Sequence, residues 1–220
     1  MAVGFDAGTW QPNIGSVTSQ NITTISVGPN NNRFLLAFIS SFTAITSPTA
    51  TWDSGGTNQA MTLTTTQANV GSTVTSYMFR LVNPVVGNKT LAFSWTTASS
   101  NIGFGASSWF GVNQQAPLYS TTSGNGSTTT PTVTINNVQG GDICTALFQT
   151  ATHSLGAPIP WLTFYSPSFG MGSDYANGAT PTGINETLSA STSASDNWIA
   201  IGTAISRALF SIDGSQTVMM

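Results

Sequence analysis

The chain has 220 residues, of which 5 % are charged and 40 % are hydrophobic, and its formal net charge at pH 7 is −3. Soluble domains usually have about a quarter charged residues, so neutral Ser, Thr, Asn, Gln and Gly must cover most of this surface. The six Trp and twelve Phe residues need a core, and they exclude a disordered chain. Nucleic acid is excluded as a partner because the basic residues are too few and too scattered to neutralise a run of phosphates; they are Arg33, Arg80, Lys89 and Arg207.

Strand signals recur along the whole chain. Helix signals are weak because Thr, Ser, Val, Ile, Gly and Asn disfavour helices and no long segment repeats apolar residues at 3.6 spacing. The predicted strands, separated by turns with Gly, Pro, Asn or Asp, are 21–27, 33–42, 50–53, 59–66, 73–82, 89–96, 102–112, 132–136, 143–152, 161–165, 183–189 and 197–206. Short strands at this spacing are typical of a sandwich or a barrel.

Two kinds of strand pattern indicate where the core lies. In NKTLAFSWTT, the apolar residues Leu91, Phe93 and Trp95 alternate with small and polar residues, which places them on one face. The segments FLLAFIS and WIAIGTAI are nearly continuous apolar runs, as expected for central strands covered on both sides or for a subunit contact. We therefore predict an all-β fold, an antiparallel two-sheet β-sandwich of the jelly-roll type.

A chain of this length fits one all-β domain. We predict an N-terminal arm or edge segment over 1–19, the sandwich over 20–210 and a C-terminal tail over 211–220. The Ser/Thr/Gly-rich segment 119–131 is predicted to be a linker or an exposed loop. No repeat at a fixed period is visible in the sequence.

The residues for nucleophilic catalysis are few. The only histidine, His153, and the only cysteine, Cys144, are expected near the two ends of one strand, without a Gly-x-Ser-x-Gly elbow. Cys144 lies in the apolar run ICTALF and has no partner for an internal disulfide, so we interpret it as a buried small hydrophobe. We assign no catalytic residue.

The carboxylates stand mostly beside Gly, Ser or Asn, where Asp commonly bonds to the backbone of a turn; they are Asp6, Asp53, Asp142, Asp174, Glu186, Asp196 and Asp213. A glycoside hydrolase would need two of them across one cleft, and Asp53, Asp142 or Glu186 are the candidates for acid and base. Zinc would need clustered Cys or His, and no EF-hand spacing is present. We expect no metal and no cofactor, although a surface calcium ion at SDYANG or WDSGG is an alternative.

Aromatic side chains near turns and strand ends are candidates for recognition of a sugar, since a flat ring can stack on a pyranose while amides bond its hydroxyl groups. The proposed stacking residues are Trp52, Trp109 and Trp161, with Tyr119, Tyr165 and Tyr175 in similar settings. The alternative is that these large rings belong to the core.

Targeting signals are not visible. The first residues lack a positive start followed by an apolar stretch, and no apolar run approaches the roughly 18 residues that span a bilayer. We therefore expect synthesis in the cytoplasm without export and no membrane partner. Four Asn-x-Ser/Thr sequons are interpreted as chance matches in a Ser/Thr-rich chain; they begin at Asn21, Asn88, Asn125 and Asn185.

The segment from Ala50 to Leu118 resembles jelly-roll modules of phage virion proteins and bacterial surface proteins. The matching stretches are TATWDSGGTNQAMTLTTTQANVG, TVTSYMFRLVNPVVGNKTLAFSWTT and GASSWFGVNQQAPL. The resemblance covers about a third of the chain. It implies a non-enzymatic module displayed on a particle or a cell surface, and a hairpin in which Trp52 and Met61 point inward, Gly55 and Gly56 turn the chain, and the threonines point outward.

These patterns predict a structural protein of a bacteriophage virion, either a head decoration (cement) protein or a fibre component. We expect a homo-oligomer, with a trimer as one option, that contacts the major capsid protein or other virion proteins. The alternatives are a carbohydrate-binding adhesin or lectin-like module that binds host-surface glycans, and a glycoside hydrolase.

Overall fold

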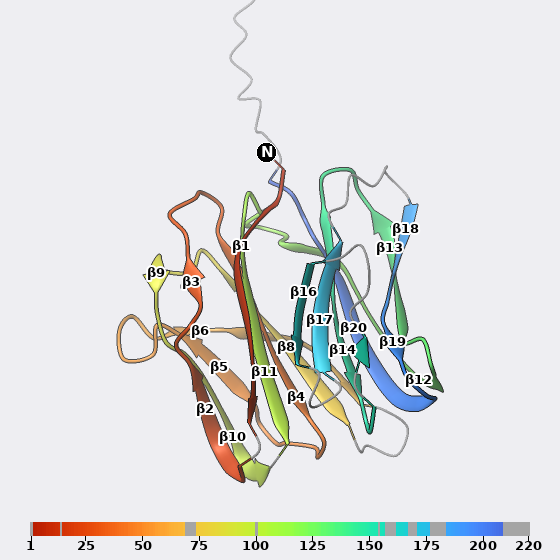
Figure 1. The fold of residues 1–220 in the computed structure, drawn as a ribbon. Coiled ribbons are helices and arrows are strands. Elements are labelled where there is room, and N and C mark those ends of the chain that lie inside the picture. Colours follow the sequence, from red (N-terminus) through yellow and green to blue (C-terminus); the bar gives the residue numbers. More distant parts are fainter. Residues whose placement is uncertain are drawn as a thin grey trace, which may run out of the picture.

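The structure, a computed structural model, describes residues 2–13, 15–68, 74–99, 101–153, 155–156, 162–166, 171–176 and 184–208. Within these ranges every regular element is a β-strand, and the strands pair in antiparallel sheets (Figure 1). The predicted all-β class with antiparallel pairing is therefore confirmed, and the sheets are consistent with a β-sandwich, but there are more than the two sheets that the sequence analysis predicted. The predicted tail over 211–220 lies outside the described residues.

Residues 4–110, the first half, form two sheets. The first inner sheet has the order β1-β11-β4-β8-β7, with β1 (Gly4–Asn13), β11 (Ile102–Phe110), β4 (Phe34–Ser41), β8 (Thr75–Val82) and β7 (Thr62–Ala68). The first outer sheet has the order β2-β10-β5-β6, with β2 (Val17–Ile22), β10 (Leu91–Ser99), β5 (Thr49–Trp52) and β6 (Gln59–Ala60). A short pair joins β3 (Ser26–Val27) to β9 (Gly87–Asn88).

Residues 118–205, the second half, are built in a similar way. The second inner sheet has the order β12-β20-β14-β17-β16, with β12 (Leu118–Thr128), β20 (Asp196–Ile205), β14 (Ile143–Thr150), β17 (Met171–Ala176) and β16 (Leu162–Ser166). The second outer sheet pairs β13 (Thr132–Val138) with β18 (Ile184–Ser189). A short pair joins β15 (Leu155–Gly156) to β19 (Ser191–Thr192).

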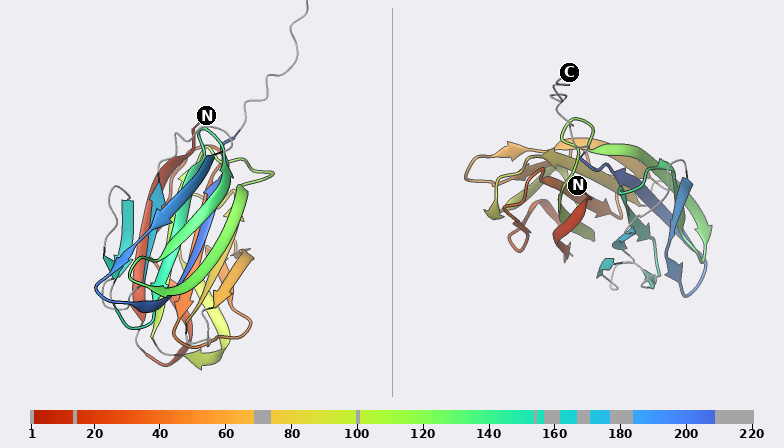
Figure 2. Two further views of the ribbon diagram at one scale, coloured as in Figure 1. Left: turned by 90° about the vertical axis from the view of Figure 1, so that its right-hand side faces the viewer. Right: turned by 90° about the horizontal axis from the view of Figure 1, so that it is seen from above.

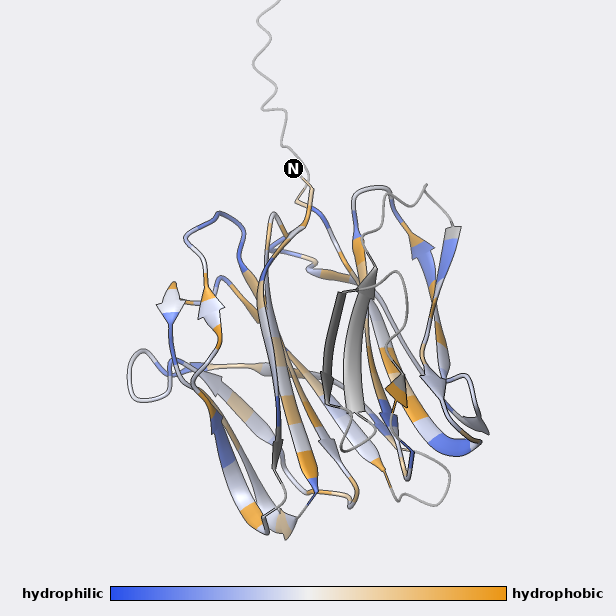
Figure 3. Ribbon diagram, viewed as in Figure 1, coloured by the Kyte–Doolittle hydropathy of each residue, from blue (hydrophilic) through white to orange (hydrophobic). Residues whose placement is uncertain are grey.

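Three core clusters stack the sheets in four layers, which Figure 1 shows side by side. The first cluster joins the first outer and first inner sheets, and the second joins the second inner and second outer sheets. The third, the central cluster, joins the two inner sheets and contains Val3, Phe34, Leu36, Phe38, Met78, Trp109, Val112, Ile143, Leu147, Ile201 and Ile205. The hydropathy colours of Figure 3 place hydrophobic segments along the strands and hydrophilic ones in the loop before β4.

The inner sheets are buried on both faces, which explains the two apolar runs of the sequence. In β4, Leu35, Ala37 and Ile39 face the first outer sheet, whereas Phe34, Leu36 and Phe38 face the second inner sheet. Strand β20 shares its residues between the second and the central cluster in the same way. The segments FLLAFIS and WIAIGTAI are therefore central strands covered on both sides, which confirms the first of the two settings predicted for them.

The two inner sheets have the same strand order. If the five strands of each inner sheet are numbered in chain order, both sheets have the spatial order 1-5-2-4-3. The outer pair β13–β18 likewise corresponds to β2–β10. Strands β2 and β13 each follow the first inner strand of their half, β10 directly precedes β11, and β18 precedes β20 with only the short strand β19 between them. The view from above in Figure 2 shows the two halves side by side. The predicted sandwich bounds, 20–210, enclose parts of both halves.

Strand β1 occupies the segment that the sequence left as an arm or an edge segment, and it is the edge strand of the first inner sheet. The hairpin prediction is also confirmed: Trp52 and Met61 are buried, β5 pairs with β6, and Gly55 takes a φ of 87° in the turn. Such a positive φ is costly for residues with a side chain.

The prediction of a linker or exposed loop over 119–131 is wrong for most of its length. Residues up to Thr128 belong to β12, which pairs along its length with β20. The signal was misleading because Gly, Ser and Thr are typical of loops, whereas here Gly126 leaves room for a ring. A Cβ added at Gly126 would lie 2.7 Å from Cζ2 of Trp198.

A Gly126→Ala substitution is expected to lower the free energy of unfolding by about 1–3 kcal/mol, since the added methyl group would press against the buried indole of Trp198. Gly124→Ala is the matched control, because its Cβ would lie 3.5 Å from the nearest atom, an ordinary contact. Urea unfolding of both variants measures the difference. Equal effects of the two substitutions would contradict the packing of Trp198 on β12.

Candidate functional site

Two polar pockets, lined by described residues, lie beside the connector 111–117, which joins the two halves. On one side of it lies the Arg33 pocket, to which Gln114 contributes, and on the other lies the Tyr119 pocket, to which Asn113 and Ala116 contribute. Both pockets lie at the end of the sheets where β4 and β14 begin and where β11 and β20 end. The two halves therefore place pockets at corresponding ends.

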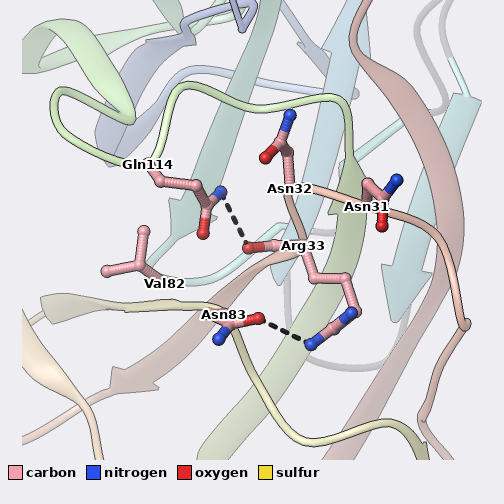
Figure 4. Close-up of a pocket in the computed structure, with 6 residues that line it drawn as sticks. All are labelled: Asn31, Asn32, Arg33, Val82, Asn83 and Gln114. Carbon is pink, nitrogen blue, oxygen red and sulfur yellow. Dashed lines mark hydrogen bonds between the residues drawn. The ribbon is translucent and has the colours of Figure 1, made fainter.

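The Arg33 pocket is an open depression of about 700 Å³, lined by Asn31, Asn32, Arg33, Val82, Asn83 and Gln114 (Figure 4). The Arg33 guanidinium donates to the carbonyl oxygen of Pro84 (2.9 Å), to that of Asn30 (3.1 Å) and to Oδ1 of Asn83 (2.6 Å). Gln114 Nε2 donates to the carbonyl oxygen of Arg33 at 3.1 Å. This arginine thus holds loops of its own chain together.

The Tyr119 pocket is smaller, with a volume of about 230 Å³. Its walls come from the connector, from the start of β12, from the turn between β13 and β14 and from the end of β20. The lining residues are Asn113, Ala116, Tyr119, Gln139, Asp142, Ser206 and Arg207. The pocket therefore combines an aromatic ring, two amides, a hydroxyl group and both signs of charge.

Asp142 is fixed at the base of this pocket. Its side chain is buried and accepts the backbone N–H of Gln139 at Oδ2 (3.2 Å) and that of Arg207 at Oδ1 (3.1 Å). The side chain of Arg207 lies over Gly141, where an added Cβ would be 2.8 Å from its Cδ. Within the described part of the chain, the Arg207 guanidinium makes no hydrogen bond and no ion pair.

Corresponding β-bulges in the two halves direct different side chains at this end. The register of β1 on β11 shifts between Phe5 and Ala7, which leaves Asp6 as the extra residue, and the register of β12 on β20 shifts between Leu118 and Ser120, which leaves Tyr119. Bulges often re-aim a side chain beside a functional site. Asp6 accepts the N–H of Gly28 and the hydroxyl group of Ser108 (3.0 Å). The ring of Tyr119 is instead 50 % exposed.

The tryptophans proposed for sugar stacking are in the core where they are described. Trp52 is 0 % exposed in the first cluster, and Trp109 is 1 % exposed in the central cluster. Their indole N–H groups donate to the carbonyl oxygen of Val85 (2.9 Å) and to Oγ of Ser107 (2.8 Å). Neither ring face can reach a ligand in this structure, so for these two the core alternative holds. Trp161 lies outside the described residues.

Cys144 and His153 lie at opposite ends of β14, as their spacing suggested. Cys144 is buried in the second cluster, and burial, together with the charges of Glu186 and Asp142, raises the pKa of its thiol to about 12. A thiol with a raised pKa is a poor nucleophile at neutral pH. His153 follows the other end of the strand, where its Nδ1 lies 3.3 Å from Oδ2 of Asp196.

Asp196 fixes the turn after β14. Its buried carboxylate accepts the backbone N–H groups of His153 (2.6 Å) and Thr152 (2.8 Å) and the Thr152 hydroxyl group (2.9 Å). Burial by itself would raise the pKa of Asp196, but these hydrogen bonds together outweigh it and lower the pKa below the ordinary value.

Asp196→Asn is expected to lower the free energy of unfolding at pH 7 by about 1–3 kcal/mol. A carboxyl group with a lowered folded pKa contributes stability above its unfolded pKa, and this contribution disappears as pH falls through the folded pKa. The difference in the free energy of unfolding between the wild type and Asp196→Asn should therefore become smaller below about pH 4. Denaturant titrations at a series of pH values measure this difference, and a constant difference would contradict the lowered pKa.

Asp53 also fixes its own turn, whereas Glu186 lies on strand β18. Asp53, with a φ of 54°, accepts the N–H and the hydroxyl group of Thr57 at 2.8 Å each, and its Oδ1 lies 3.4 Å from Nζ of Lys89. The backbone hydrogen bond from Thr57 is the largest cause of its lowered pKa. Asp213 and the side chain of Asp174 lie outside the described residues. Among those described, no three His, Cys, Asp or Glu residues form a group that could hold a metal ion.

Comparisons with known proteins gave no match among family models, curated proteins or solved structures. In the described ranges no helix has the length and apolar character needed to cross a membrane.

Proposed function

We propose that the protein is a non-enzymatic structural component of a bacteriophage virion, a head decoration protein or a fibre component, that assembles through protein–protein contacts. The observation that carries this proposal is the chemistry of the outer sheet faces, which are neutral and rich in hydroxyl groups. The virion location and synthesis in the host cytoplasm are parts of the same proposal.

The outer faces support contact with other protein surfaces. On the first outer sheet, Thr49 and Ser94 share a hydrogen bond of 2.8 Å between exposed hydroxyl groups, and on the second, Thr134 and Thr187 share one of 3.0 Å. Removing charged groups from water is costly, whereas hydroxyl groups can exchange water for a partner. A second copy or a capsid lattice could cover these faces at a small desolvation cost.

The placement of the acids supports a role other than catalysis. Asp6, Asp53, Asp142 and Asp196 each accept a backbone N–H group of a nearby loop or turn. Carboxylates used in this way hold loops in place. We therefore rank glycoside hydrolysis by Asp53, Asp142 or Glu186 below a structural role.

Jelly-roll connectivity for the first half belongs to the proposal. Eight of its strands, taken in chain order, are β1, β2, β4, β5, β6, β8, β10 and β11. Numbered 1 to 8 in this order, the strands of the inner sheet have the spatial order 1-8-3-6 (β1-β11-β4-β8). Those of the outer sheet have the order 2-7-4-5 (β2-β10-β5-β6). This order supports a chain wound as a double Greek key, with β7 as an added edge strand. The resemblance of residues 50–118 to virion modules points the same way.

The test is assembly of the purified protein. Analytical ultracentrifugation should show a closed oligomer, and cosedimentation with capsids of the source phage should show binding. A lysine in the middle of the first outer face, Ser94→Lys, is expected to weaken self-association or capsid binding at least tenfold. Ser54→Lys, in an exposed turn, is the matched control. A protein that stays monomeric at high concentration and does not bind these capsids would contradict the proposal.

A further inference from the structure

We propose that the Tyr119 pocket binds a single neutral pyranose residue of a glycan, with the Tyr119 ring stacked on the sugar and Asp142 and Arg207 bonded to its hydroxyl groups. This inference does not depend on the proposed role in a virion. It rests on the position of one exposed ring, on fixed and unpaired polar groups around it, and on the size and charge of the pocket.

The exposed ring is the first element of the site. Tyr119 is the most exposed large apolar residue among those described, and it lines the pocket. The bulge in β12 places it there, at the position that Asp6 occupies in the first half. Asp6 is tied to its own loop, whereas the Tyr119 hydroxyl group has no partner within the described chain. An aromatic ring with a free polar tip suits a ligand that has both apolar and polar faces.

The polar groups are the second element. Asp142 uses one lone pair of each oxygen on backbone N–H groups, so its geometry is fixed and each oxygen can accept a further hydrogen bond. The Arg207 guanidinium and the Gln139 amide offer donors without partners among the described residues. Asn113 Oδ1 accepts the N–H groups of Gln115 (3.0 Å) and Ala116 (3.2 Å), which leaves its Nδ2 as a donor. Vicinal sugar hydroxyl groups both donate and accept, and they match this set.

Size and charge define the ligand further. A volume of about 230 Å³ lies below the range of roughly 300–1,000 Å³ usual for larger ligands, and it therefore suits one ring. Asp142 and Arg207 carry opposite charges, so a neutral sugar leaves the site balanced, whereas an acidic sugar would face the Asp142 carboxylate. The described lining of the larger Arg33 pocket has no aromatic residue, and its arginine is hydrogen-bonded to its own chain.

Saturation-transfer NMR of the full chain with single sugars tests the proposal. The probes are glucose, galactose, mannose, fucose, N-acetylglucosamine and N-acetylgalactosamine, with glucuronate as the acidic comparison. At least one neutral sugar should bind, and Tyr119→Ala should weaken its binding at least tenfold. Tyr119→Phe, which keeps the ring, should stay within about threefold of the wild type. Val82→Ala, a truncation at the exposed lining of the Arg33 pocket, is the matched control and should not change binding.

Tyr119 is half exposed, so its variants should fold, and thermal unfolding followed by circular dichroism checks that they do. The absence of a saturation-transfer signal for all six neutral sugars would overturn the proposal. Binding that survives Tyr119→Ala, or that Val82→Ala removes, would overturn the assignment to this pocket. Binding of glucuronate alone would overturn the neutral class of ligand.

Discussion

Replacement of Trp109 by alanine is expected to lower the free energy of unfolding by about 3–5 kcal/mol. The indole is 1 % exposed in the central cluster, its N–H donates to Ser107 Oγ at 2.8 Å, and the ring of Phe5 meets it edge-on at 5.2 Å between centroids. Truncation therefore leaves a large cavity between the inner sheets and removes an aromatic pair.

Guanidinium titration of the purified variant measures this loss. Trp109→Phe should lower the free energy of unfolding less than Trp109→Ala does, because it keeps an aromatic ring in this space. Tyr119→Ala, which truncates an exposed ring on the same end of the molecule, should cost little. A Trp109→Ala variant as stable as the wild type would mean that this ring is not buried and would restore it as a candidate for stacking on a sugar.

Among these substitutions, a carboxylate placed between the two inner sheets should lower the free energy of unfolding the most. Leu147 is 1 % exposed on β14 and belongs to the central cluster, so Leu147→Asp would bury a charge without a partner. We expect a loss of more than about 4 kcal/mol, enough to unfold much of the protein at neutral pH. The loss should be smaller in acid, where the new carboxyl group is neutral.

Leu63→Asp is the matched control, since this leucine lies on the edge strand β7 and is 43 % exposed. It should change the free energy of unfolding by less than about 0.5 kcal/mol. Soluble yield and urea unfolding compare the two variants. If Leu147→Asp were tolerated as well as Leu63→Asp, the face-to-face packing of the inner sheets would be contradicted.

The strands that sequence patterns located best are those with apolar runs. Predicted strands 33–42, 143–152 and 197–206 match β4, β14 and β20 within two residues at each end, because Leu, Ile, Phe and Ala in unbroken runs fit a strand covered on both faces. The edge strands β1 and β12 escaped detection. Their glycines and hydroxyl residues are typical of loops, and the reason for Gly126 is the ring of Trp198, which lies far along the chain.

The repeated strand order escaped detection for a related reason. Corresponding strands are separated by loops of different length, and the second half is shorter than the first, so the sequence has no fixed period. Burial of β4 and β14 requires similar apolar content but not identical residues. A topology can therefore recur where a pattern search at constant spacing sees nothing.

The members of the Tyr119 pocket were each visible in the sequence but not as a group. Tyr119 was placed in a linker, Asp142 in a turn and Arg207 at the end of an apolar run. They meet because β12, β14 and β20 are neighbours in one sheet, and because a bulge turns Tyr119 toward the pocket. Strand order and a one-residue register shift are long-range properties, which local periodicity does not contain.

The apolar strands β4 and β20 are covered within a single chain by the packing of its two inner sheets. Hydrogen exchange followed by mass spectrometry over a hundredfold range of protein concentration tests this directly. We predict that amides of β4, β14 and β20 exchange most slowly and that their protection does not depend on concentration. Protection of β4 and β20 that disappears on dilution would show that another subunit covers them, and it would contradict the four-layer packing.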